Sequence, residues 1–384
     1  MEAAGQQRVV RAEDVAHMGL TEVLRHALYI HSQYRALVRD LKRNPPALAI
    51  LIDFPDVNFR LAMHCKRLGV PVLWFVSPQL WAWKRRRLRW VQRFVDRMLV
   101  IFPFEEPFYR ARGVDAEFVG HPLATLPLPT VSREEYAAEH GLRLKTEFVD
   151  PRQKKDWIAL LPGSRWKEIQ ENLPTMLEAA AILGGNYEFL LPVAWTLDWQ
   201  QVQNLVESSK NDGHRATPPI HLVPDARAAL HHARASIVAS GTATVQALTI
   251  GNPFIVVYRV SALTFAIVKR MVRYPAEIPA QPDADGNLPI AMPNLIAGRR
   301  IIPEFLNQRF TAANLAAALK PLLADTPARA QMIADLAEAR AKLLPTPLEG
   351  GKPADPIQRV CAAAESLLQS SPSRSAAPTP PARV

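Results

Sequence analysis

The sequence predicts an α/β protein built from two doubly wound, Rossmann-like domains. Short and nearly continuous apolar runs alternate with helix-length stretches, as expected of parallel strands that helices cover on both faces. The runs form two series, which a polar stretch at about Leu126–Lys155 separates. The chain of 384 residues is also longer than a single hydrophobic core usually supports.

The predicted strands fall into a series of four followed by a series of five. The first series consists of Ala47–Pro55, Pro71–Pro78, Arg97–Phe104 and Ala116–Pro122. The second series consists of Asp156–Ser164, Tyr187–Ala194, Ile220–Val223, Ala235–Ser240 and Pro253–Val260. Helices are expected between the strands, for example over Asn58–Leu68 and Trp83–Val95.

We therefore expect one domain over residues 1–145 and another over residues 146–344, facing each other across a cleft. A helix at about 345–368 is expected to complete the first domain. The tail at 369–384 has low complexity and is expected to be disordered. The start is unusual, because Met1–Arg11 is polar and the first strong strand begins only near Ala47. A domain that begins in the middle of its sheet predicts that an N-terminal segment is missing.

Charge and cysteine content narrow the class of protein. The net charge of +10 favours a polyanionic partner, such as nucleic acid, anionic lipid or a phosphorylated substrate. The two cysteines, Cys65 and Cys361, have no metal-ligand spacing and suit a reducing cytoplasm. No apolar run is long enough for a signal peptide or a membrane span. These features predict a cytoplasmic protein without a metal site.

One segment combines aromatic and basic side chains. Trp81 and Trp83 are followed directly by Lys84, Arg85, Arg86 and Arg87. Such a segment can stack on single-stranded bases or anchor a protein at a membrane surface. A solvated basic helix face explains the same pattern without any partner, so the residues alone leave these interpretations open.

Asp53 and Asp56 follow the first predicted strand. Ligands bind beyond the carboxyl ends of the strands in open parallel sheets, which is where both carboxylates lie. Asp53 is nearer the sheet, so we expect it to be more desolvated and the better general base. Either residue could instead cap the helix near Asn58. For Asp56 we favour the cap, whereas for Asp53 both roles stay open.

Two short turns follow strands of the second series. In Gly163-Ser164-Arg165, glycine permits close backbone approach, the helix N-terminus offers free N–H groups, and arginine adds positive charge. Ser240-Gly241-Thr242 repeats this arrangement two strands later. Ordinary turn and capping chemistry also explains each pattern. Two such turns in one domain could nevertheless hold one diphosphate from neighbouring strand ends.

Several segments resemble signature motifs of the lipid-A-disaccharide synthases. Val76–Trp83 (VSPQLWAW), with the basic run after it, is similar to the family's VSPQVWAWR segment. The other similar segments, in the family's order, are Phe102–Glu105, Phe118–Leu123, Leu161–Arg165, Ala239–Thr244, Tyr258-Arg259 and Met292–Arg299. The similarity extends over about Met1–Asn307, and chance does not readily produce several independent motifs in one order.

The resemblance implies the two-domain GT-B fold and an inverting glycosyltransferase that needs no cofactor and no metal. Its substrates would be UDP-2,3-diacylglucosamine and 2,3-diacylglucosamine 1-phosphate, joined by a β-1,6 linkage with release of UDP. Asp53 matches the family's proposed base, and Arg165 matches its essential arginine. The positions that match the donor side are Gly163, Ser164, Ser240, Gly241, Thr242, Asn294 and Glu304.

Acylated substrates would also explain the aromatic and basic segment. The resemblance implies a peripheral enzyme on the anionic, cytoplasmic face of the inner membrane of a Gram-negative bacterium, with Trp81, Trp83 and Lys84–Arg87 at that surface. The resemblance leaves open whether the enzyme forms a homodimer. A nucleic-acid partner is not expected, because charge alone supports it and no recognised module is present.

Some features depart from the family pattern. Gln246 stands where the family usually has glutamate, and Arg234 and Thr125 replace common aspartates. The start at Met1–Gly5 resembles an internal stretch of the family, so about 40 residues, more than the first half of a β-α-β unit, are expected to be missing. Two alternatives are therefore kept: another GT-B enzyme acting on a UDP-sugar, and a binding protein that truncation has made inactive.

Overall fold

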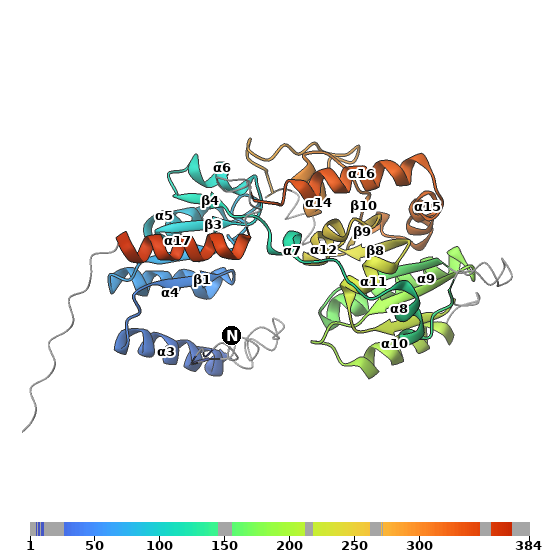
Figure 1. Cartoon of the computed structure of the whole chain (residues 1–384), viewed down its shortest axis with the longest axis horizontal. Helices are drawn as coiled ribbons and strands as arrows, with labels where there is room; N and C mark the ends of the chain where they lie inside the picture. Colours follow the sequence, from blue (N-terminus) through green and yellow to red (C-terminus); the bar gives the residue numbers. More distant parts are fainter. Residues whose placement is uncertain are drawn as a thin grey trace, which may run out of the picture. The chain divides into compact units, whose positions relative to one another are not determined.

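The computed structural model describes residues 27–144, 156–211, 218–261, 272–345 and 355–370, with Gly5, Gln7, Val9, Val10 and Arg270. The chain forms two compact units, one of residues 1–120 with 345–384 and one of residues 121–344 (Figure 1). The sequence predictions for the polar start and for the tail fall largely outside the described residues. No helix among these residues is both long and apolar enough to cross a bilayer.

The first unit contains a four-stranded parallel sheet in the order β1-β2-β3-β4. Its strands are β1 (Ala49–Ile52), β2 (Val72–Phe75), β3 (Arg97–Val100) and β4 (Ala116–Phe118). Its helices are α3 (Ala27–Arg43), α4 (Pro55–Arg67), η2 (Arg85–Arg87), α5 (Leu88–Phe94), α6 (Glu105–Arg110) and α17 (Pro356–Ser370). All four predicted strands are confirmed, and β2 is buried along its whole length.

The second unit contains a six-stranded parallel sheet in the order β10-β9-β8-β5-β6-β7. Its strands are β5 (Asp156–Leu161), β6 (Tyr187–Pro192), β7 (Ile220–Val223), β8 (Ala235–Ala239), β9 (Phe254–Tyr258) and β10 (Glu304–Leu306). Its helices are α7 (Pro122–Thr125), α8 (Arg133–His140), α9 (Trp166–Leu183), α10 (Trp199–Asn211), α11 (Ala226–His232), α12 (Thr242–Ile250), α14 (Met292–Ala297), η4 (Asn307–Arg309), α15 (Ala312–Leu323) and α16 (Pro327–Ala341).

The five predicted strands of the second series are confirmed, and β10 was not predicted. β10 has only three residues and lies at the edge of the sheet, so it lacks the long apolar run that marks a buried strand. The strand order reverses between β5 and β8, which are direct neighbours although two strands separate them along the chain. In open parallel sheets such a reversal opens a crevice at the carboxyl ends of the strands.

The units divide at Gly120, whereas the sequence analysis placed the first boundary at 145. The residues after Gly120 belong to the second unit because α8 packs against the start of β5. The Arg133 guanidinium lies 3.8 Å from the ring centre of Trp157, and Tyr136 packs against the same indole. The C-terminal α17 groups instead with the first unit, where Arg359 pairs with Glu117 of β4 at 3.4 Å (Figure 1).

A buried carboxylate organises the interior of the first unit. Glu105 Oε1 accepts hydrogen bonds from Ser77 Oγ at 2.7 Å and from Trp81 Nε1 at 3.0 Å. Its Oε2 accepts from the Phe102 backbone N–H at 3.1 Å. Glu105 therefore ties the loop after β2 to the loop after β3. Burial raises the pKa of this carboxyl to about 7, even though these donors and the Ile101 backbone N–H oppose the shift.

This raised pKa predicts a specific dependence of stability on pH. Between about pH 4.5 and pH 7, folded Glu105 retains a proton that the unfolded chain has released, so the free energy of unfolding falls as pH rises through this window. The loss should be on the order of 3 kcal/mol. Glu105→Gln has no ionisable group at this position, so it should remove this part of the dependence of the unfolding free energy on pH. Chemical unfolding between pH 5 and pH 8 measures the effect.

Ser77→Ala is the matched control, because it deletes one donor and keeps the buried carboxyl. It should retain the dependence on pH. Parallel pH profiles for the wild type and Glu105→Gln would contradict the prediction.

Candidate active site

Asp53 lies in a strained turn at the end of β1. Asp53 and Phe54 have φ of 44° and 43°, in the left-handed region that residues other than glycine rarely adopt. Buried Asn58 of α4 holds this turn, because its Nδ2 donates to Ile52 O at 3.1 Å and to Asp53 O at 2.7 Å. Strain maintained by buried contacts is typical of functional sites.

Two expectations about the aspartates are wrong. Asp53 is exposed within the described structure, not desolvated, although its backbone N–H still donates to Phe75 O of β2 at 3.0 Å. Asp56 is not the helix cap: Phe54 occupies the cap position of α4, and Asp56 lies in the first turn. There it pairs with Arg87 at 2.5 Å, a partner 31 positions later that its own sequence context does not indicate.

Gly163-Ser164-Arg165 forms the turn between β5 and α9, and a carboxylate of the protein already occupies it. Glu168 Oε2 accepts from the backbone N–H of Ser164 at 3.0 Å and of Arg165 at 3.4 Å. The Arg165 side chain is exposed and reaches Glu168 Oε1 at 3.4 Å. A Cβ on Gly163 would lie 2.5 Å from the Cβ of Glu168. Glycine is therefore needed here for the approach of Glu168, a contact that the sequence analysis missed.

Ser240-Gly241-Thr242 forms the corresponding turn between β8 and α12. Gly241, with φ of 151°, occupies the cap position of α12 without a side-chain hydrogen bond to the helix. The first N–H groups of a helix have no partner within it. Gly241 and Thr242 are both exposed residues. This end of α12 is suited to bind an anion.

The sheet brings the two turns together. Leu161 of β5 pairs with Val238 of β8, so the same register carries Gly163 alongside Ser240. On the other side of β8, the Ser240 N–H donates to Val257 O at 2.9 Å, and Tyr258 follows at the carboxyl end of β9. Burial and, to a smaller extent, the charge of Glu168 raise the pKa of the Tyr258 hydroxyl. Both turns, with Glu168 and Tyr258, therefore lie at the carboxyl ends of the strands at and beside the reversal.

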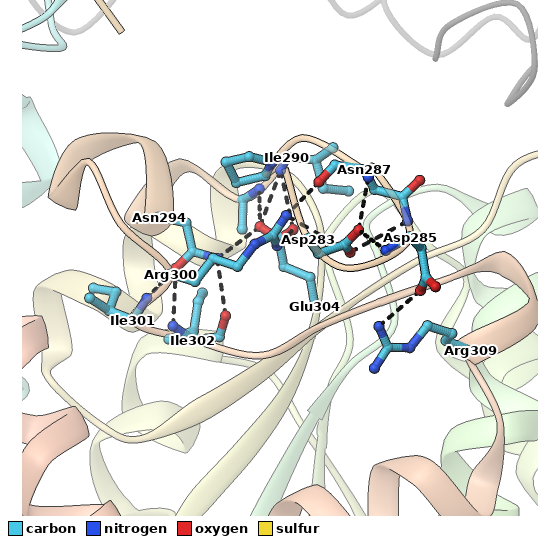
Figure 2. Close-up of polar contacts among 12 residues, drawn as sticks. Asp283, Asp285, Asn287, Ile290, Asn294, Arg300, Ile301, Ile302, Glu304 and Arg309 are labelled. Carbon is cyan, nitrogen blue, oxygen red and sulfur yellow. Dashed lines mark hydrogen bonds and ion pairs between the residues drawn. The ribbon is translucent and has the colours of Figure 1, made fainter. Parts of the chain in front are cut away.

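Asn294 and Glu304 lie in a polar cluster whose groups bond to one another (Figure 2). Asn294 is fully buried, and its Oδ1 accepts from the Ile301 and Ile302 N–H groups at 2.7 and 3.0 Å. Its Nδ2 donates to Ile302 O at 3.0 Å and to Glu304 Oε1 at 2.9 Å. These contacts satisfy the amide within the protein, so Asn294 organises the segment around it.

Glu304 is the centre of the same cluster. Its side chain is almost fully buried and accepts from the N–H groups of Ile290 at 3.1 Å and Ala291 at 2.9 Å. Arg300 Nη1 donates to its other oxygen at 3.0 Å, and Arg300 Nη2 donates to Asn287 O at 2.6 Å (Figure 2). Glu304 therefore holds the start of α14 and the proline-rich stretch before it against the edge strand β10.

The aromatic and basic segment divides into a buried part and an exposed part. Trp81 is buried, with its N–H bonded to Glu105, so the prediction that it lies at a membrane surface is wrong. Trp83 is half exposed, and Lys84 Nζ lies 4.2 Å from the centre of its ring. Lys84, Arg85 and Arg86 are exposed, whereas Arg87 pairs with Asp56. Trp90 of α5 adds an exposed indole that the sequence analysis did not single out.

The structure also locates two of the positions, Arg234 and Gln246, at which the sequence departs from the family pattern. Arg234 precedes β8, at the opposite end of the strand from the Ser240 turn, and its guanidinium bonds to Leu323 O and pairs with Asp325. It supports the end of α15 and has no place at the crevice. Gln246 lies on α12, four positions after Thr242.

His121 is a buried histidine at the start of the second unit. Burial lowers the pKa of His121 to about 4, and its Nδ1 accepts from the Leu123 N–H at 3.1 Å as the cap of α7. Among the described residues, His, Cys, Asp and Glu form no group of three or more that could hold a metal ion.

Comparison with known proteins identifies the family. The model of the lipid-A-disaccharide synthetase family matches residues 1–344. A lipid-A-disaccharide synthase of Acidobacterium capsulatum is 53% identical over 96% of this chain and 87% of its own length. A lipid-A-disaccharide synthase of Koribacter versatilis is 45% identical over 89% of this chain and 83% of its own length.

A solved structure of S. aureus MnaA with UDP has the same kind of fold. It shows a TM-score of 0.52 at 11% identity, over 88% of this chain and 80% of that chain. The two parallel α/β units have the GT-B fold predicted from the sequence. The chain belongs to the lipid-A-disaccharide synthase family of glycosyltransferases.

Proposed function

We propose that this protein joins two acylated glucosamines in lipid A biosynthesis. The donor is UDP-2,3-diacylglucosamine, the acceptor is 2,3-diacylglucosamine 1-phosphate, and the products are the β-1,6-linked disaccharide 1-phosphate and UDP. One observation carries the proposal most directly: the turns after β5 and β8 lie side by side at the strand reversal. Each turn opens a helix, so together they suit a diphosphate.

The reaction is a single inverting displacement. The acceptor 6-hydroxyl oxygen forms a bond to the donor's anomeric carbon while the bond from that carbon to the β-phosphate oxygen breaks. The hydroxyl proton passes to Asp53, and UDP leaves with the electron pair of the broken bond. The strained turn held by Asn58 supports this role, since it fixes the backbone from which the carboxylate extends.

Negative charge develops on the departing diphosphate, and Arg165 with the helix N-termini would stabilise it. At the N-terminus of α12, Gly241 and Thr242 are exposed. At the N-terminus of α9, the Glu168 carboxylate accepts hydrogen bonds from the N–H groups of Ser164 and Arg165. A diphosphate that binds there exchanges places with the Glu168 carboxylate, because one N–H group cannot serve two anions fully.

Asn294 and Glu304 contribute to the donor side indirectly in this proposal. Their polar groups bond to backbone groups of Ile290, Ala291, Ile301 and Ile302, so they fix the loop that precedes β10. The loop's position, and not a direct hydrogen bond from these side chains, would then shape the donor site.

The substrates carry acyl chains, so the proposal includes peripheral binding at the cytoplasmic face of an anionic inner membrane. Trp83, Lys84, Arg85 and Arg86 form the supporting surface, which we call the basic loop. Its exposed indole and three exposed cations suit the region where lipid head groups meet acyl chains.

Asp53→Asn should lower kcat by about 10²–10⁴-fold, the usual range for loss of a general base. The side chain is exposed, so folding should be unchanged by circular dichroism. Asp56→Asn is the matched control, because this exposed carboxylate pairs with Arg87 and should be dispensable for turnover. Near-normal turnover in Asp53→Asn would remove this residue from the base role.

Arg165→Ala should lower kcat by about 10²–10³-fold, as expected for loss of a charge-stabilising donor, with a smaller effect on the acceptor KM. Steady-state kinetics with varied acceptor separates the two parameters. Lys167→Ala removes an exposed cation two positions later and should leave both near the wild-type values. A raised acceptor KM with unchanged kcat would instead assign Arg165 to acceptor binding.

The basic loop predicts binding to anionic vesicles that salt weakens. Each basic residue near such a surface contributes about 1 kcal/mol, and salt screens that attraction. Changing Lys84, Arg85 and Arg86 to glutamine should therefore abolish most co-sedimentation at low salt. Changing three other exposed lysines, Lys167, Lys320 and Lys342, to glutamine is the control for net charge. Equal binding of the wild type to neutral and anionic vesicles would exclude the electrostatic contact.

A further inference from the structure

Trp195 is an exposed aromatic side chain close to the proposed diphosphate turns. It follows β6 by three positions and is 82% exposed, far more than any other large apolar residue among those described. For comparison, Trp199 at the start of α10 is 43% exposed. An indole this open leaves a large apolar surface in water, which a flat ligand could cover.

The loop that carries Trp195 is bonded to the β5 turn. β6 pairs with β5 in parallel, so the carboxyl ends of both strands share one edge of the sheet. Thr196 Oγ1 donates to Ser164 O at 2.9 Å, which joins the residue after Trp195 to the middle of the β5 turn. The indole is thus attached to the rim of the strand-reversal crevice, on the side away from β8.

The backbone of this loop is fixed on both sides of the indole. The Leu197 N–H donates to Ala194 O at 2.9 Å and closes a turn around Trp195. Asp198 Oδ1 accepts from the Gln201 N–H at 2.8 Å and anchors the start of α10. A ring on a preorganised loop loses little conformational entropy when a ligand stacks on it.

We propose that Trp195 is the stacking platform for the planar base of the nucleotide donor. This inference rests on the proposed function, which places the diphosphate between the β5 and β8 turns. The base then extends over β6 towards Trp195, and the sugar extends over β9 towards Tyr258. The two aromatic residues flank the crevice from opposite sides, so they also set the direction in which the donor lies.

Isothermal titration calorimetry on the full chain tests the proposal with UDP, UMP and pyrophosphate as probes. Trp195→Ala should weaken the binding of UDP and UMP by about 5- to 100-fold, the range expected for loss of one base–aromatic stack. It should leave pyrophosphate binding unchanged, because pyrophosphate contains no base. Trp195→Phe should restore most of the affinity for UDP. Unchanged unfolding midpoints should accompany each variant, since the side chain is exposed.

Trp199→Ala is the matched control and should bind UDP like the wild type. Equal UDP affinity in the wild type and Trp195→Ala would overturn the stacking role. Loss of affinity only for the acylated donor, with UDP unaffected, would also overturn it and assign the indole to an acyl chain. Failure of the wild type to bind either UDP or pyrophosphate would instead reject the proposed function itself.

Discussion

The parallel pairing of β5 with β8 is the constraint on which the candidate site depends. These strands are separated by β6 and β7 in the chain but are hydrogen-bonded neighbours in the sheet. Their pairing fixes the register that brings Gly163 alongside Ser240, and it places β6 and β9 on opposite sides. Parallel strands end at a common edge, so two helix N-termini and two aromatic side chains gather at one crevice.

Carboxylates maintain this arrangement from within the protein. Glu168 accepts hydrogen bonds from the N–H groups of the β5 turn, and Glu304 accepts from those at the start of α14. The first is partly open to solvent, whereas the second is buried and satisfied on both oxygens. The same chemical group therefore holds an open turn in one place and a buried loop in the other.

The first unit concentrates backbone strain at the carboxyl ends of its strands. Asp53 and Phe54 after β1 and Val76 after β2 all have positive φ, which costs free energy in residues with a Cβ. Asn58 holds the first turn by two hydrogen bonds, and Glu105 holds the loop after the second strand through Ser77 and Trp81. Buried polar groups thus compensate for conformations that the local sequence does not favour.

The sequence alone determined nine of the ten strands among the described residues, the GT-B fold and the family. Apolar runs mark buried parallel strands wherever they occur, so all nine predicted strands appear, and the polar turns at their ends could be located. The sequence could not determine which distant segments contact one another. The burial of Trp81, the exposure of Asp53, the pairing of Asp56 with Arg87 and the Asn294–Glu304 cluster all depend on contacts made outside each residue's own motif. Local pattern fixes the conformation of a segment, whereas the environment of a side chain is decided only when distant segments pack together.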